Sequence, residues 1–130
     1  MILDWLLNRM PWSADARSLW HAQSAGLLIG YAPASALTDL FYIARRAKDI
    51  PTAFACIYRV MVAFETLPVD DALLRLARAL PGNDFEDNVQ IACAQASGLD
   101  LIVTRDAAGF TQAGLPVIAP PDIERYLPQP

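Results

Sequence analysis

The sequence is sparing with several residue types, and each scarcity excludes a class of protein. Lysine and arginine number 10 against 14 aspartates and glutamates, and the net charge of −4 excludes a basic domain that binds nucleic acid by bulk charge alone. A nuclease that gathers acids around a cation remains open. The two cysteines, Cys56 and Cys93, lie far apart within apolar helical patterns, so we expect both to be buried and reduced. His21 is the one histidine, and its place on an amphipathic helix is typical of a surface or core residue.

Long apolar runs are also missing. No run approaches the roughly 18 residues that a membrane span needs, and the longest candidate, residues 53–64, is broken by Arg59. The N-terminus has no basic region before its apolar residues, and Asp4 interrupts them, so it does not read as a signal peptide. We therefore expect a cytoplasmic protein with no membrane partner.

Apolar residues, in contrast, are plentiful. They make up 55% of the 130 residues, while charged residues make up only 18%. This length suits a single domain, residues 1–130, with a core large enough to be stable. Such a composition favours a sheet that is covered by helices on both faces.

Breakers and caps divide the chain into alternating apolar and amphipathic segments. Apolar runs predict strands at residues 27–32, 64–69, 101–104 and 117–119. Helical spacing predicts helices at residues 1–9, from the N-cap Ser13 to the stop at Gly26, at 35–47, at 51–63, from the cap Asp70 to residues 81–82, at 84–97 and at 122–126. Strands that alternate with helices predict an α/β domain with a mostly parallel sheet.

Three groups of acids are candidates for chemistry, because functional groups gather at the carboxyl ends of parallel strands. Asp39 lies in mid-helix on a partly apolar face, where a carboxylate is costly unless a cation meets it. Asp84 and Asp87 share a face at the start of the helix at 84–97, beside Asn88. Asp106 follows the strand at 101–104 by two residues.

Each acid also has an ordinary structural explanation. Asp39 can belong to an exposed polar stripe, Asp84 can cap its helix, and Asp106 can sit in a turn. We expect Asp84 to be the cap and Asp87 to be functional, with Glu86 pointing the opposite way, to water. Taken together, Asp39, Asp87 and Asp106 predict a carboxylate nest for a hard cation such as Mg²⁺ or Mn²⁺.

Three stretches carry a family resemblance, which runs over nearly the whole chain. Residues 84–90 and 102–110, with Thr104 directly before Arg105 and Asp106, resemble the C-terminal half of a PIN domain. Residues 35–46 resemble the second motif of the same family. The closest resemblance is to the VapC-like toxins, which are PIN ribonucleases of bacterial toxin–antitoxin pairs.

The resemblance implies a three-layer domain and a metal-dependent endoribonuclease that hydrolyses RNA with one or two Mg²⁺ or Mn²⁺ ions. Asp87 and Asp106 match metal-binding acids of the family. Asp39 matches a position that is usually glutamate, and Thr104 matches a hydroxyl residue that lines the same pocket. The family also implies an RNA substrate, a homodimer and a cognate antitoxin.

The start of the chain departs from the family pattern. PIN domains open with an apolar strand that ends in Asp-Thr-Asn and lies in the centre of the sheet, and residues 1–7 resemble the helix that follows it. We therefore expect a mis-assigned start codon, with the strand and its metal-binding acid encoded upstream in frame. Without that strand we expect weak or absent nuclease activity, and either direct pairing of the neighbouring strands or a dimer.

Two other function classes compete with the nuclease. A PIN-like interaction module that has lost catalysis fits the missing first acid. A phosphoacceptor receiver-like domain would need paired acids after a first strand and a lysine after a late strand, but the only lysine, Lys48, lies in mid-chain.

Overall fold

The computed structural model describes residues 12–128, and the side chains from residue 17 onward. Its elements run α2 (Trp12–Ser24), β1 (Tyr31–Pro33), α3 (Ala34–Ala47), α4 (Ile50–Ala63), β2 (Glu65–Leu67), α5 (Asp71–Ala79), α6 (Phe85–Ala96), β3 (Ile102–Val103), the 3₁₀ helix η1 (Ala107–Phe110), β4 (Val117–Ile118) and the 3₁₀ helix η2 (Pro120–Tyr126). The predicted helix at residues 1–9 lies outside the described residues.

The described strands form two separate parallel pairs. β1 pairs with β2 in the register Tyr31 to Glu65, and β3 pairs with β4 in the register Ile102 to Val117. The predicted α/β class with parallel strands is therefore confirmed. Among the described residues β1 and β3 do not pair with each other, so the direct pairing of neighbouring strands that we considered does not occur.

The strands are shorter than the apolar runs predicted. Residues 27–30 belong to no strand, and β1 begins only at Tyr31. Residues 101 and 104 likewise fall outside the paired part of β3. The prediction of a buried strand at residues 27–32 was wrong for much of the run, because Leu27 is 45% and Ile29 is 66% exposed. Ladder pairing needs a neighbouring backbone, and before β1 the Gly30 carbonyl accepts a hydrogen bond from Glu65 N–H (2.9 Å).

Two helices have the capping side chains that the sequence predicts. Asp70 accepts a hydrogen bond from Leu73 N–H (2.9 Å), and Asp84 accepts one from Asp87 N–H (3.0 Å). α4 begins at Ile50, one residue before the predicted start at Pro51, and Asp49 is its cap: the Asp49 carboxylate accepts from Thr52 N–H (2.7 Å), and its hydrogen bonds with Thr52 lower the pKa of Asp49. α2 begins at Trp12, so Ser13 lies inside the helix and not at the N-cap position that the sequence predicted.

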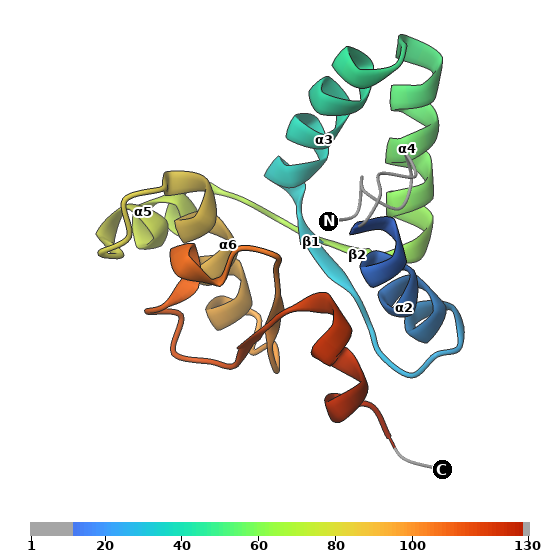
Figure 1. Cartoon of the computed structure of the whole chain (residues 1–130). Coiled ribbons are helices and arrows are strands. Elements are labelled where there is room, and N and C mark those ends of the chain that lie inside the picture. The colour runs from blue at the N-terminus through green and yellow to red at the C-terminus, as the bar shows by residue number, and fades with distance from the viewer. Residues whose placement is uncertain (1–11, 129–130) are drawn as a thin grey trace.

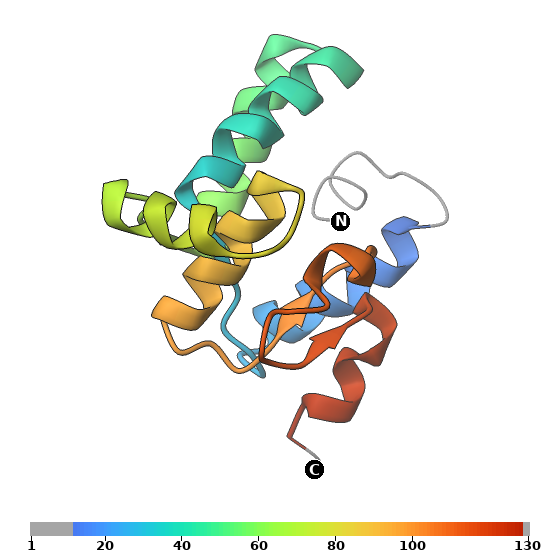
Figure 2. The same ribbon diagram turned by 90° about the vertical axis from the view of Figure 1, so that its left-hand side faces the viewer.

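The helices divide the molecule into two parts. α3 and α4 form an antiparallel hairpin that projects from β1 and β2, while α5 packs on α6 at the other end of the two strands (Figure 1). Turned by 90°, the hairpin points away from the region that holds β3, β4 and η2 (Figure 2). Both cysteines are buried and free, as predicted. Cys56 belongs to the core cluster between α3 and α4, and Cys93 belongs to the cluster between α5 and α6. Of the helices described, none has the length and apolar content to cross a membrane.

Candidate functional site

The acids of the first turn of α6 lie against the turn that follows β3. Asp87 is half-buried there, and a Cβ added at Gly109 of η1 would overlap its Oδ2 atom. Burial raises the pKa of Asp87, and the nearby carboxylates of Asp84 and Asp106 raise it further. The predicted division of labour is confirmed for Asp84, whose carboxylate caps the helix, while Asp87 remains available at the surface of the site.

Asp106 is held in place by local hydrogen bonds. Its backbone N–H donates to Thr104 Oγ1 (3.1 Å), and its Oδ1 accepts from Ala108 N–H (3.2 Å), which caps η1. Thr104 is anchored in turn through its own N–H, which donates to Ile118 C=O of β4 (3.0 Å). The carboxyl end of β3 therefore positions Asp106 towards Asp87, as expected for the end of a parallel strand.

Glu86 is exposed, as predicted, but the sequence argument missed its partner. Its side chain does not simply point to water: it shares a hydrogen bond with Asp39 of α3, and this contact is the main cause that raises the pKa of Glu86. Burial and the charges of Asp39, Asp84 and Asp87 raise that pKa further. The side chains of Glu86 and Asp39 therefore lie close together, and α3 and α6 approach each other at this point.

The contact between Glu86 and Asp39 was missed for a geometric reason. Side chains at a helix start fan out by about 100° per residue, so Glu86 and Asp87 face different neighbours. Helical spacing alone grouped Asp84 with Asp87 and assigned the remaining direction to solvent. It could not show that the exposed Asp39 of α3 lies in that direction.

The carboxylates at this site are suitable ligands for a divalent cation, but their spacing is less suitable. Carboxylate oxygens are the ligands that Mg²⁺ and Mn²⁺ prefer, and a cation would relieve the neighbouring negative charges that raise the pKa values of Glu86 and Asp87. Yet within residues 17–128 no group of three or more His, Cys, Asp or Glu side chains is close enough to hold a metal ion. The nest of Asp39, Asp87 and Asp106 therefore stays a prediction, with Glu86 as an addition to it.

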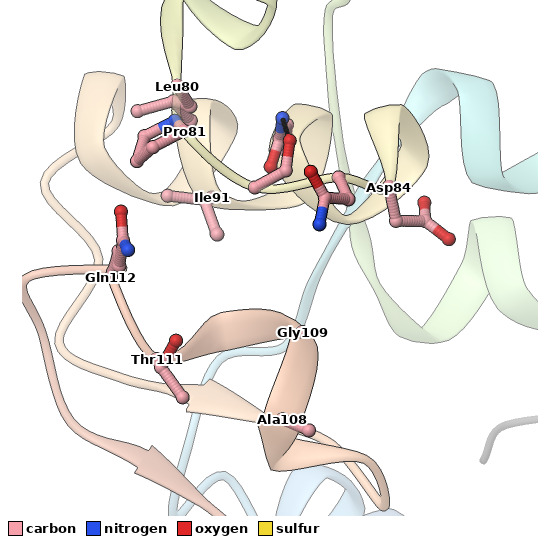
Figure 3. A pocket seen from close by; sticks show the side chains of 11 residues that line it. Leu80, Pro81, Asp84, Ile91, Ala108, Gly109, Thr111 and Gln112 are labelled. Atoms are coloured by element: carbon pink, nitrogen blue, oxygen red, sulfur yellow. Dashed lines mark hydrogen bonds between the residues drawn. The ribbon is translucent and has the colours of Figure 1, made fainter.

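A hollow of about 400 Å³ opens between the start of α6 and η1. Figure 3 shows its two walls: Leu80, Pro81 and α6 on one side, and η1 with Ala108 and Gly109 on the other. Asn88 lies in its wall and is buried; its Nδ2 donates to Gly82 C=O (3.0 Å), while its Oδ1 has no partner among the described residues. Of the acids, Asp84 lines the hollow, and Asp87 lies next to it through its contact with Gly109.

A family model described as a PIN domain matches residues 1–108. The chain belongs to the PIN domain family. This confirms the resemblance drawn from residues 84–90 and 102–110 at the level of the family, which is one of nucleases. Among curated proteins, none matches the chain.

Proposed function

We propose that this PIN domain is a metal-dependent endoribonuclease and acts as the toxin of a toxin–antitoxin pair in the cytoplasm. The observation that carries the nuclease is the set of repelling carboxylates at the start of α6 and the end of β3, where Asp87 is held near Asp84 and Asp106. Acids so placed destabilise the metal-free chain and are compensated when a cation binds. Their position beside a hollow in a nuclease family supports catalysis over a purely structural role.

Each residue has a stated role in this proposal. Asp87 and Asp106 hold the Mg²⁺ or Mn²⁺ ion, and Asp39 extends the set through its partner Glu86. Thr104 positions Asp106 by accepting its N–H. When bound, such an ion lowers the pKa of a coordinated water and stabilises the charge that develops on a phosphodiester.

The proposed toxin role and the proposed dimer depend on a different surface, that of the α3–α4 hairpin. The α3–α4 hairpin exposes large apolar side chains, namely Tyr42, Ile43, Ile50, Phe54, Tyr58, Met61 and Val62. Contiguous apolar surface of this kind marks an interface with another protein. We propose that a second copy of the chain covers it in a homodimer and that a cognate antitoxin controls the enzyme.

A catalytically disabled interaction module is the second candidate. It is favoured by the same exposed hairpin, and by the lack of a ready three-ligand group among residues 17–128. It differs from the nuclease in needing no metal, so metal dependence separates the two.

The deciding experiment measures cleavage of a single-stranded RNA with Mg²⁺, Mn²⁺ or EDTA. Asp87→Asn removes a metal-binding charge, while Asp71→Asn removes an exposed acid of α5 whose surface ion pair with Arg75 is worth little. We expect weak metal-dependent cleavage by the chain and by Asp71→Asn, and a loss on the order of a hundredfold in Asp87→Asn. Equal rates in Asp87→Asn would show that Asp87 has no part in the cleavage. No cleavage by the unchanged chain, together with no Mn²⁺-dependent rise in its unfolding temperature, would establish the interaction module instead.

A further inference from the structure

Asn88 of α6 is a buried amide with only one of its two ends hydrogen-bonded. Its side chain is 3% exposed, and its Nδ2 donates to Gly82 C=O (3.0 Å). Its Oδ1 meets no donor in the part of the chain that the structure describes. Because a buried oxygen without a partner is costly, this atom indicates a donor that the described chain does not itself supply.

The Asn88 side chain belongs to the wall of the hollow between the start of α6 and η1. Gly82 lines the same wall directly beside it, because a Cβ added at Gly82 would overlap Asn88 Oδ1. Any side chain at residue 82 would therefore crowd this oxygen. The volume of the hollow, about 400 Å³, lies within the range of sites that bind small molecules.

The lining of the hollow suits a flat, neutral group better than a phosphate. Leu80, Pro81 and Ile91 form an apolar wall on the side of α6, and Gln112 faces them from the segment after η1 (Figure 3). Asp84 adds a carboxylate, and none of the described lining residues carries a positive charge that would pair with a phosphate. An apolar wall with a few polar groups is typical of sites that bind a small ring by its face and its edge.

The hollow also adjoins the acids of the proposed metal site. Gly109 of η1 lines the hollow, and a Cβ at this glycine would overlap Asp87 Oδ2. The hollow and the acid therefore lie on two sides of the same glycine. A single-stranded RNA with a phosphodiester at Asp87 can place a neighbouring base in the hollow, because unpaired bases splay away from their backbone.

We propose that the hollow is a base-binding subsite, in which Asn88 Oδ1 accepts a hydrogen bond from the exocyclic amino group of adenine or cytosine; the RNA ligand rests on the proposed nuclease function. Since Asn88 Nδ2 is already bonded to Gly82, the side chain offers an acceptor alone. Adenine and cytosine present an amino group at the position where guanine and uracil present a carbonyl oxygen. A carbonyl would face a second acceptor there, so guanine and uracil are disfavoured.

The test measures the binding of RNA octamers to the 130-residue chain by fluorescence anisotropy, in EDTA so that no metal-dependent cleavage occurs. The octamers consist of adenosine, cytidine, uridine or purine riboside, which is adenosine without its amino group. We expect adenosine to bind about tenfold more tightly than purine riboside, and cytidine about tenfold more tightly than uridine, because the weaker ligand of each pair leaves Oδ1 unpaired.

Two variants test the role of Asn88 Oδ1. Gly82→Ala crowds this oxygen with a methyl group and keeps the amide, while Asn88→Ala removes the amide. We expect both to bind adenosine and purine riboside octamers with similar affinity. Ser97→Ala, at the exposed far end of α6, is the control and should keep the preference. Circular dichroism checks that each variant is folded, and Gly82→Ala decides if Asn88→Ala does not fold.

A second measurement locates the bound base. Nuclear magnetic resonance follows the side-chain amide signals of Asn88 and Gln112 while the adenosine octamer is added. We expect both signals to shift, because both side chains line the hollow. The side-chain amide of Gln23, which bonds Ala63 C=O and Gly30 N–H elsewhere in the molecule, should stay unchanged.

Three results would overturn the proposal. Equal affinities of the adenosine and purine riboside octamers would show that no amino group is recognised. A preference that persists in both folded variants would place its origin outside Asn88. A constant Asn88 signal with every octamer would show that the hollow takes no base. The failure of the nuclease is a different result, a lack of metal-dependent cleavage, so the two failures are distinguishable.

Discussion

Helices α4 and α6 are of similar length, but they are used in opposite ways. The middle of α6 is covered on every side, because four consecutive residues, Ile91 to Ala94, are buried, while its first turn is open at Phe85 and Glu86. α4 buries only the stripe of Ala53, Cys56 and Val60, and leaves Phe54 63% and Tyr58 70% exposed. A helix whose middle is packed in this way holds its accessible first turn in a fixed position, which is what a catalytic acid needs.

The exposed side of α4 is suited to association with another molecule rather than to catalysis. Its apolar side chains exceed what the core beneath α3 and α4 uses, and a hairpin that projects from the rest of the molecule has no further part of the described chain to pack against (Figure 2). This contrast supports our proposals that chemistry takes place at the start of α6 and association at the face of α4.

Charged substitutions on the exposed face of α4 should have the largest effect, which is on association. The double change Phe54→Glu and Tyr58→Glu places two charges on the exposed apolar face, and we expect it to convert the proposed dimer into a monomer, because buried like charges without partners are strongly unfavourable. Light scattering at tens of micromolar measures the mass.

Leu76→Glu, on the exposed side of α5, is the matched control and should leave the dimer intact. A monodisperse monomer of the unchanged chain, with full helical content, would show that α4 is not a dimer interface.

Some of these features could be predicted from the sequence, and others could not. The caps Asp70 and Asp84 and the parallel α/β class were predicted correctly, because local hydrogen bonds and hydrophobic periodicity determine them. The meeting of Glu86 with Asp39 was not, because it joins residues 47 positions apart (86 − 39) through the packing of two helices.

The lengths of the strands could not be predicted from the sequence either. Residues 27–32 and 101–104 have the composition of strands, but pairing depends on which backbone lies beside them. Only the tertiary arrangement decides how much of an apolar run is buried and joins a ladder, and Ile29 in the first of these runs is 66% exposed.

On the α6 side, the strongest effect on stability should come from Asn88. Its side chain is only 3% exposed and ties α6 to the preceding loop through Gly82 C=O. We expect Asn88→Ala to lower the free energy of unfolding by about 1–3 kcal/mol, because the carbonyl is left unpaired and the side-chain volume is lost. Urea titration followed by circular dichroism measures the change, and Asn83→Ala, at an exposed neighbouring position, should change it little.

Gly109→Ala should act on function more than on stability. A Cβ at Gly109 would overlap Asp87 Oδ2, so the carboxylate must turn away while the helices stay in place. We expect about a tenfold loss of Mn²⁺ affinity, of the size that a displaced supporting contact costs at a metal site. Calorimetric titration with Mn²⁺ measures it, and Ala108→Ser on the same 3₁₀ helix is the control; unchanged affinity in Gly109→Ala would mean that Asp87 does not bind the ion.

The smallest expected effect is the pH dependence of stability at Asp87. Its first-turn position in α6 favours a negative charge through the helix dipole, but burial and the charges of Asp84 and Asp106 outweigh this and raise its pKa above the ordinary value of 3.8. A raised pKa in the folded state means that the contribution of this group to stability is present below the unfolded pKa and is lost as the pH rises through the folded pKa. In EDTA we therefore expect Asp87→Asn to be more stable than the unchanged chain at pH 7, by less than about 1 kcal/mol, and the difference to vanish near pH 3. Urea unfolding across this range measures it. Saturating Mn²⁺ should reverse the order at pH 7, since the ion compensates the charge that the variant lacks; an Asp87→Asn variant that is less stable than the unchanged chain in EDTA at pH 7 would show that the dipole, and not the repulsion, dominates at the start of α6.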